Sequence, residues 1–215
     1  GPRSGKSIMK LSHLIATLPL PQGADDIEIT HITSDSRQVR EGSIFAALKG
    51  AAADGRDFIP QAIERGASAV LAAPGLTEMP VPYIAVDNPR QTYAYIAARL
   101  YPGQPETVVA MTGTNGKSST VEFLRQIWSY AGQKAACFGT LGIVSDAGTA
   151  PLTHTTPDAS ALQQTLADLN AQGITHCGME ASSHGLHQYR LDGVRLAATG
   201  FTNLTQDHFD YHSDA

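Results

Sequence analysis

The chain has 215 residues, of which 42% are hydrophobic and 16% are charged, and its formal net charge is −5. This composition favours a packed α/β protein over a disordered chain, and the mildly acidic balance without a basic stripe argues against a nucleic-acid partner. The longest apolar runs are too short to span a bilayer, so no membrane insertion is expected.

The cysteines and the first residues bear on the cellular setting. Cys137 and Cys177 both lie in apolar, strand-like runs, a setting typical of buried, reduced thiols. No signal-peptide pattern opens the chain, so we expect a cytoplasmic protein. Residues 1–7 imitate a phosphate-binding loop, but they are one residue short of the required spacing and no strand precedes them. We therefore interpret residues 1–8 as a cloning remnant.

Proline and glycine in residues 101–105 divide the rest of the chain, and we expect an N-terminal domain at 9–103 and a second domain at 104–215. In the first region, strands are expected at 27–32, 43–47, 69–72 and 83–86, and helices at 58–65 and 90–100. Pro89 precedes the second of these helices, where proline favours a helix start.

The second region opens with a continuous apolar run at 107–111, which is typical of a strand buried on both faces. Further strands are expected at 135–138, 174–179 and 197–201, and helices from about residue 118 and over 157–170. We predict that the first helix turns these apolar side chains inward: Val121, Phe123, Leu124, Ile127, Trp128 and Ala131. Thr156 is the predicted N-cap of the second.

Strands that alternate with helices predict an α/β fold with a mostly parallel sheet. We expect an N-terminal α/β domain followed by the front part of a P-loop-type central domain. In such sheets, ligands bind at the carboxyl ends of the strands. The residues that directly follow each strand are therefore the candidates for a functional site.

A glycine-containing loop joins the strand at 107–111 to the following helix. Its residues are Gly113, Thr114, Asn115, Gly116, Lys117, Ser118 and Ser119. Glycines let backbone N–H groups close around phosphate oxygens, and the helix N-terminus adds its dipole. Lys117 is placed to reach the β- and γ-phosphates and Ser118 to offer its hydroxyl to Mg²⁺, although Met111 stands where the standard motif has glycine. The loop predicts binding of ATP with magnesium.

Polar side chains also follow two later strands. Glu180 comes directly after the strand at 174–179, where a carboxylate close to a phosphate loop suits a second magnesium contact. His208 and neighbouring carboxylates follow the strand that ends at Phe201, a pattern that indicates a metal or phosphate site. Each residue alone is more often a helix cap, an ion-pair partner or a structural histidine. Their shared placement at one edge of the sheet favours a site.

With these motifs the chain resembles the Mur ligases, the ATP-dependent amide ligases of peptidoglycan synthesis. It is most similar to the MurE type, which adds the third residue of the stem peptide to UDP-MurNAc-L-Ala-D-Glu. The resemblance covers nearly all of residues 9–215, and its marks are the segments 34–37, 53–56, 155–158, 179–186 and 202–212. The family's variant phosphate loop would account for Met111.

The resemblance implies roles for individual residues. It assigns ATP to residues 113–119, catalysis to Lys117, Glu180 and His208, and Mg²⁺ to Ser118, Glu180 and His208. It places uridine and its diphosphate against Ser34, Ser36, Ala51, Ala52 and Ala53. It places the MurNAc-dipeptide near His154, Thr155, Thr156, Ser182, Gln188 and Arg190. For Asp35 and Arg37, an internal ion pair and a ligand contact are equally open.

The reaction implied by the resemblance has two steps. The γ-carboxylate of D-Glu attacks the γ-phosphate of ATP to give an acyl phosphate, and the amine of an incoming amino acid then releases phosphate. Diaminopimelate is the favoured amino acid and lysine the alternative. Family members continue past the position of Ala215, so we expect the 215-residue chain to be inactive alone. Asp87-Asn88-Pro89-Arg90 has the letters of the family's diaminopimelate motif, but it lies in the wrong region and does not identify the amino acid.

Three other interpretations are open. A folylpolyglutamate-synthase-like ligase would carry a similar loop, but the segments 34–37 and 182–190 favour a UDP-sugar substrate. A P-loop kinase or GTPase would need a strict phosphate loop and an aspartate after a later strand, and neither is found. The last interpretation is a non-catalytic UDP-sugar-binding module.

Overall fold

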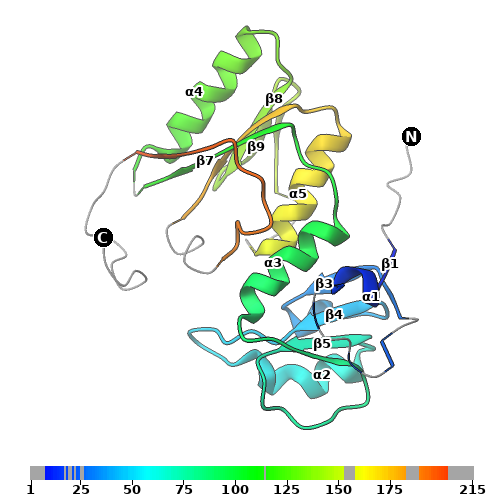
Figure 1. Ribbon diagram of the computed structural model, residues 1–215. Helices are drawn as coiled ribbons and strands as arrows, with labels where there is room; N and C mark the ends of the chain where they lie inside the picture. The colour runs from blue at the N-terminus through cyan, green and yellow to red at the C-terminus, as the bar shows by residue number, and fades with distance from the viewer. Residues whose placement is uncertain are drawn as a thin grey trace. The chain divides into compact units, whose positions relative to one another are not determined.

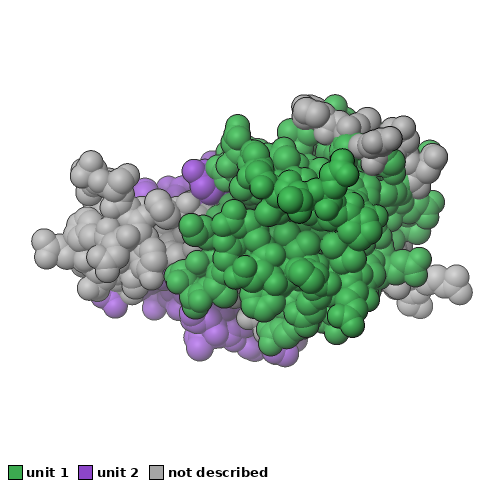
Figure 2. All heavy atoms as spheres, turned by 90° about the horizontal axis from the view of Figure 1, so that it is seen from below, with its two compact units in different colours: residues 1–101 green, residues 102–215 purple. Residues whose placement is uncertain are grey.

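The computed structural model describes residues 8–16, 18, 21, 23–24, 27–113, 115–152, 158–182 and 189–202. The chain divides into two compact units, residues 1–101 and 102–215, which Figure 1 draws as ribbons and Figure 2 separates by colour. Within the described part of the chain, no helix has the length and hydropathy needed to cross a membrane.

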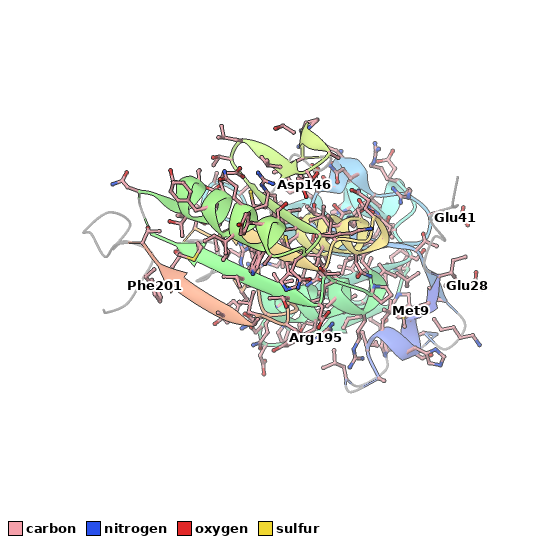
Figure 3. The ribbon with its side chains drawn as sticks, turned by 90° about the horizontal axis from the view of Figure 1, so that it is seen from above. Met9, Glu28, Glu41, Asp146, Arg195 and Phe201 are labelled. Atoms are coloured by element: carbon pink, nitrogen blue, oxygen red, sulfur yellow. The ribbon has the colours of Figure 1, made fainter. Side chains whose placement is uncertain are left out.

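The first unit begins with a small antiparallel pair. Strand β1 (Met9–Lys10) pairs with β2 (Glu28–Ile29), and the short helix α1 (Leu11–Leu14) follows β1 directly. Figure 3 labels Met9 and Glu28 on these two neighbouring strands. Leu11 and Leu14 of α1 and Ile29 of β2 are buried, so the helix and the strand pair contribute side chains to the core.

A four-stranded parallel sheet forms the centre of the first unit. Its strands are β3 (His31–Thr33), β4 (Ser43–Ala46), β5 (Ala69–Ala72) and β6 (Tyr83–Ala85), which lie in the order β3-β4-β5-β6. Every residue of β3, β4 and β5 is buried, as expected for strands covered on both faces. The four strands expected from sequence are thus present, although 27–32 is split between β2 and β3.

Successive strand residues point to opposite sides of this sheet, so buried side chains lie on both of its faces. Helices cover both faces. Phe45 and Val70 pack with Ile59 and Ala62 of α2 (Ile59–Glu64). Helix α3 (Pro89–Leu100) contacts β3 and β5 and buries Tyr93, Ile96 and Leu100 along one stripe. The Asn88 side chain caps α3 by accepting from the Gln91 N–H at 3.2 Å, and Pro89 lies in the first turn. The predicted helix start is confirmed.

The second unit holds a six-stranded sheet in the order β10-β9-β8-β11-β7-β12. Strands β7 (Thr107–Thr112), β8 (Ala135–Gly139), β11 (His176–Glu180) and β12 (Ala198–Phe201) are parallel. Strands β9 (Gly142–Ser145) and β10 (Gly148–Ala150) continue from β8 as an antiparallel meander that the sequence analysis did not predict. Figure 3 labels Asp146 at the β9–β10 turn and Phe201 at the end of β12.

Two helices pack on opposite faces of this sheet. Leu166 and Leu169 of α5 (Ala159–Ala171) form a core cluster with Cys177 of β11. On the other face, α4 (Lys117–Tyr130) places Val121 against Gly178. The cap of α5 differs from the prediction, because Asp158 accepts from the Ala161 N–H at 2.8 Å and the helix begins at Ala159. The predicted cap, Thr156, lies outside the described residues.

The inward face predicted for α4 was partly wrong. Val121 is buried, but Phe123 and Ile127 are 63% and 64% exposed. Each helical residue turns the side chain by about 100°, so Phe123 lies roughly 200° from Val121 and cannot share its face. Phe123, Ile127 and Tyr130 follow helical spacing on the solvent side instead.

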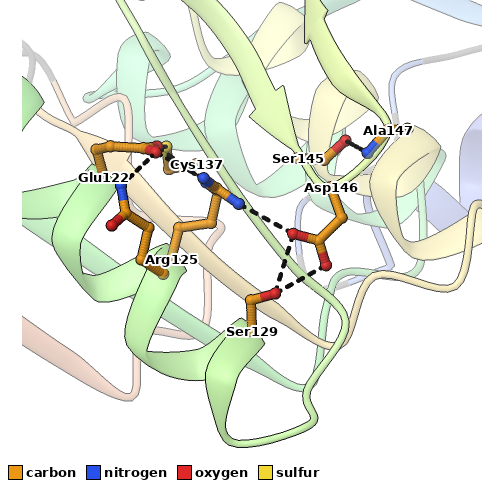
Figure 4. A network of polar contacts seen from close by, with 8 residues as sticks. Glu122, Arg125, Ser129, Cys137, Ser145, Asp146 and Ala147 are labelled. Carbon is orange, nitrogen blue, oxygen red and sulfur yellow. Dashed lines mark hydrogen bonds and ion pairs between the residues drawn. The ribbon is translucent and has the colours of Figure 1, made fainter.

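A polar network fastens α4 to the β9–β10 turn (Figure 4). The Arg125 guanidinium donates to Glu122 at 2.6 Å and to Asp146 at 3.1 Å, and Ser129 donates to Asp146 at 2.9 Å. Arg125 lowers the pKa of the Glu122 carboxyl to about 2. The Cys137 thiol donates to the same carboxylate at 3.3 Å, and burial raises the pKa of this thiol to about 12.

Both cysteines are free and buried, which confirms the predicted burial of the two thiols. Burial also raises the pKa of the Cys177 thiol. Cys137 is paired with Gly178 in the sheet register, and Cys177 with Ala136. Because alternate residues of a strand point to opposite faces, the two thiols lie on opposite sides of the sheet.

Candidate functional site

The carboxyl ends of the parallel strands of the second unit bring four segments together. β7 ends at Thr112 and leads into the phosphate loop, and β11 ends at Glu180 beside it, since Glu180 is paired with Met111. On the other side of β11, β8 ends at Gly139. The fourth segment follows β12, where Phe201 is paired with Thr112. This arrangement matches the edge at which the sequence predicted a site.

The phosphate loop has the backbone that an anion cradle needs. Gly113 and Gly116 adopt φ values of 130° and 80°, which L side chains rarely tolerate. Gly116 is the N-cap of α4 and makes no side-chain capping bond, so the first N–H groups of this fourteen-residue helix remain available to a ligand. Lys117 is the first helical residue. The loop therefore presents donors and a cation at one helix end.

Glu180 joins this loop through Ser118. The Ser118 hydroxyl donates to Glu180 Oε1 at 2.7 Å, and the Thr140 N–H donates to Glu180 Oε2 at 3.2 Å. Ser118 and Glu180 are 62 residues apart in the chain, yet they are the two described residues to which the sequence analysis assigned Mg²⁺. The structure thus brings this predicted pair into direct contact.

The donor set of this pair fits magnesium. Mg²⁺ prefers oxygen ligands and is usually held by one or two protein side chains together with substrate phosphates and water. A serine hydroxyl and a carboxylate 2.7 Å apart, next to a phosphate loop, supply this combination. Among the described residues, no group of three or more His, Cys, Asp or Glu side chains could hold a metal, so the pair would depend on phosphate oxygens to complete the ligand set.

Thr202 also holds the loop, a role that the sequence analysis did not assign. Its hydroxyl donates to the Asn115 carbonyl at 2.6 Å and to the Thr112 carbonyl at 3.2 Å, and its N–H donates to Thr112 at 2.9 Å. These bonds tie the residue after β12 to the residue before the loop and to a residue within it. The available signals were its position after a predicted parallel strand and its place at the start of the segment 202–212, one of the marks of the resemblance.

The carboxyl edge of the first unit's sheet is organised by two Asp-x-Arg turns. Asp35 caps the 3₁₀ helix η1 (Ser36–Gln38), and Asp54 caps η2 (Gly55–Phe58). In each turn the arginine two residues on pairs with the capping carboxylate, at 2.9 Å for Arg37 and 2.6 Å for Arg56. Arg56 lowers the pKa of the Asp54 carboxyl to about 2, and Arg37 lowers that of Asp35. The internal ion pair left open for Asp35 and Arg37 is therefore present.

The predicted uridine contacts differ in their exposure. Ser36 is buried, and its hydroxyl donates to Gln61 Oε1 at 2.9 Å. Ser34 is partly exposed at the end of β3. Ala51, Ala52 and Ala53 are exposed in a tight turn in which the Gly50 N–H donates to the Ala53 carbonyl at 2.9 Å.

Arg90 braces this alanine turn. Its guanidinium donates to the Lys49 carbonyl at 2.7 Å, and burial lowers the pKa of Arg90. Lys49 also forms a β-bridge with Asp54, which links the turn to η2. The segments predicted for the diphosphate and the Asp-Asn-Pro-Arg helix start are thus connected in space, which the sequence alone did not indicate.

The predicted dipeptide contacts are only partly described. Ser182 is exposed two residues after β11, and Arg190 lies in the turns that follow Tyr189, a residue with a φ of 60°. The remaining predicted site residues lie outside the described part of the chain: Thr114, His154, Thr155, Thr156, Gln188 and His208.

Comparison with known families agrees with this arrangement of fold and loop. Residues 111–215 match the Mur ligase middle domain, and residues 28–101 match the catalytic domain of the Mur ligase family. The chain belongs to the Mur ligase family.

Individual relatives are also similar. The chain is 51% identical over 208 residues to UDP-N-acetylmuramoyl-L-alanyl-D-glutamate--2,6-diaminopimelate ligase of Brucella melitensis biotype 1, and 51% identical over 207 residues to the protein of the same name from Mesorhizobium japonicum. Each alignment covers 95% of this chain and 43% of the relative. A solved structure of a ligase with this name superposes with a TM-score of 0.79 at 30% identity, covering 96% of this chain and 42% of that one. The chain thus spans less than half the length of these relatives.

Proposed function

We propose that this chain is the sugar-nucleotide-binding and phosphate-binding part of an ATP-dependent ligase that extends UDP-MurNAc-L-Ala-D-Glu by one amino acid, meso-diaminopimelate by preference. The observation that carries the proposal is the contact between Ser118 and Glu180 at the start of α4, with Lys117 beside it. The 51% identity to two ligases of this name supports the choice of substrate. A ligase of peptidoglycan precursors would work in the cytoplasm.

The residues of the second unit would act by position and charge. Backbone N–H groups at the α4 N-terminus and the Lys117 ammonium would bind the ATP phosphates and offset the negative charge that opposes attack by a carboxylate. Ser118 and Glu180 would hold Mg²⁺, which when bound neutralises phosphate charge. A substrate carboxylate oxygen then bonds to the γ-phosphorus as ADP leaves. The amine next bonds to the acyl carbon, losing a proton, as phosphate departs.

The first unit would anchor the sugar nucleotide. The exposed alanine turn offers backbone groups, and the partly exposed Ser34 offers a hydroxyl at the same sheet edge. Small residues let a diphosphate approach the backbone closely. Ser36 would act through Gln61 rather than by direct contact, because its hydroxyl is buried against that side chain.

A binding titration tests the proposal. Isothermal calorimetry of the full-length protein should show saturable binding of UDP-MurNAc-L-Ala-D-Glu and of Mg²⁺ with a non-hydrolysable ATP analogue. Folate should not bind. Binding of folate in place of the sugar nucleotide would indicate a folylpolyglutamate-type ligase. Binding of the sugar nucleotide without any nucleotide binding would indicate a non-catalytic module.

A further inference from the structure

Gly139, at the end of β8, lies against the Glu180 carboxylate. A Cβ atom added at Gly139 would lie 1.5 Å from Glu180 Oε2, 2.2 Å from Cδ and 2.7 Å from Cγ. Gly139 does not adopt a positive φ, so its backbone conformation is open to any residue. Glycine is needed here because the carboxylate occupies the space of a side chain.

Three other glycines of the same sheet also lie close to neighbouring atoms, but they differ from Gly139. At Gly142 an added Cβ would meet the Ala150 carbonyl oxygen at 2.5 Å, and the φ of 101° at Gly142 itself favours glycine. At Gly178 an added Cβ would meet Val121 at 3.4 Å, which is ordinary packing against α4. At Gly200 it would meet the thioether end of Met111 at 2.6 Å, and that flexible side chain can move aside. The Glu180 carboxylate cannot move freely, because both of its oxygens accept hydrogen bonds.

The turn after Gly139 distinguishes these two oxygens. Gly139 is paired with Gly142, so Thr140 and Leu141 alone form the β8–β9 turn and the position of the Thr140 N–H is fixed by the hairpin. The Thr140 N–H donates to Oε2 of Glu180, and Oε1 of the same carboxylate accepts from the Ser118 hydroxyl. Each bond holds one oxygen, so losing either of them would weaken the constraint on rotation of the carboxylate.

We propose that Gly139 is a positioning residue for the cation and nucleotide site: its missing side chain makes room for the Glu180 carboxylate, and the following Thr140 N–H turns one oxygen of that carboxylate toward Ser118. This inference rests on the proposed function, since it assumes that Glu180 serves Mg²⁺ bound with ATP. Partners that orient a metal ligand typically change metal affinity by about 10–100-fold when they are lost.

The test measures binding rather than turnover. In full-length protein, calorimetry with Mg²⁺ and a non-hydrolysable ATP analogue should show at least about tenfold weaker binding for Gly139→Ala, within the range for residues that orient ligands. Gly178→Ala adds the same methyl group to the neighbouring strand against α4 and should bind like wild type. UDP-MurNAc-L-Ala-D-Glu binding should not change in either variant.

A second pair of variants covers the case in which Gly139→Ala fails to fold. Glu180→Ala removes the Cγ, Cδ and Oε2 atoms that a Cβ at residue 139 would meet. In that background, Gly139→Ala should weaken nucleotide binding by less than about threefold, because the clash has been removed and the two changes are not additive. A loss as large as in the wild-type background would overturn the inference.

The outcomes separate the inference from the proposed function. If the wild-type protein binds the nucleotide with Mg²⁺ and a folded Gly139→Ala variant binds it equally well, the proposed role of Gly139 is overturned and the proposed function stands. Failure of the wild-type protein to bind the nucleotide with Mg²⁺ would overturn both.

Discussion

Each unit places its candidate site at the carboxyl edge of its own sheet. The contacts that hold the two sites together are of different kinds. In the first unit, the Asp-x-Arg turns are fixed by bonds between residues two apart, such as Asp35 with Arg37 and Asp54 with Arg56. In the second unit, Glu180 bonds to residues 62 and 40 positions away, and Thr202 bonds to a loop residue 87 positions away. The Asp-x-Arg turns of the first unit are organised locally, whereas the edge of the second unit is organised by topology.

This difference has a physical consequence for mutations. A local turn keeps its shape through its own capping bonds, so a single lost charge should matter little there. A site assembled from several strands requires each of them in register, and loss of one contact changes the position of a reacting group. We therefore expect the largest effects in the second unit and the smallest in the Asp-x-Arg turns.

The largest effect is expected for Lys117→Ala. Removing the cation that we propose to face the transferring phosphoryl group should lower kcat by about 10²–10³-fold or more, the scale for loss of one electrostatic donor. The fold should persist, because Lys117 is partly exposed in the first turn of α4 and is not part of the core. Phosphate release by the full-length protein measures the loss, with the exposed Lys134→Ala as the matched control. Near-normal turnover in Lys117→Ala would contradict the assignment of the loop.

A large but selective effect is expected at Ser34. Ser34→Trp places bulk at the end of β3 and should weaken UDP-MurNAc-L-Ala-D-Glu binding at least about tenfold, or about 1.4 kcal/mol. Nucleotide binding should be unaffected. Ser34 is a better position than the buried Ser36, where tryptophan would also overpack the interior. Gln38→Trp adds the same bulk to an exposed position of η1 and is the control. Equal affinity of wild type and Ser34→Trp for the sugar nucleotide would contradict the placement of uridine at this edge.

A moderate, pH-dependent effect is expected at Glu122. Arg125 lowers the pKa of Glu122 from 4.5 to about 2, so the carboxylate stabilises the folded state above about pH 4.5 and loses this contribution as the pH falls toward 2. Because the pair is partly exposed, Glu122→Gln should lower the free energy of unfolding by only about 1 kcal/mol at pH 7.

Urea unfolding followed by fluorescence measures this change, since Trp128 of α4 is the single tryptophan of the chain. The difference between wild type and Glu122→Gln should shrink steadily below pH 4.5. Glu106→Gln, at an exposed position of the same unit, should show no such trend. A difference that stays constant from pH 7 to pH 3 would mean that the ion pair is not its source.

The smallest effects are expected in the local turns. Asp35→Asn and Asp54→Asn remove the ion pair, but an asparagine side chain still accepts from the Arg37 or Arg56 N–H and keeps the cap. Their melting temperatures and sugar-nucleotide affinities should match those of wild type within error. A marked loss of sugar-nucleotide affinity would instead support the direct ligand contact that the sequence left open for this turn.

The same contrast explains what could be predicted from sequence. The strand-to-helix alternation, the phosphate loop and the helix start at Pro89 depend on neighbouring residues, and each was located within a few positions. The pairing of Glu180 with Ser118 was inferred from the rule that carboxyl ends of parallel strands meet and from the resemblance to the Mur ligases. Gly139 and Thr140 carried no local signal, because their role arises from the side chain of a residue about 40 positions away.

The errors have equally specific causes. The β9–β10 meander was missed because both strands are short, and β10 is exposed while β9 is only partly buried. The interior of α4 was overcounted because apolar residues occupy two of its faces, and composition alone does not tell which face meets the sheet. For α5, Thr156 and Asp158 are both good capping residue types, and the structure selects Asp158.

The measurement that tests the central claim most directly is phosphate release by the full-length protein with each substrate omitted in turn. We predict release only when ATP, Mg²⁺, UDP-MurNAc-L-Ala-D-Glu and meso-diaminopimelate are all present, with formation of the UDP-MurNAc-tripeptide confirmed by mass. Release that is unchanged without the sugar nucleotide, or that occurs with folate in its place, would contradict the assignment of the first unit and the ligase function together.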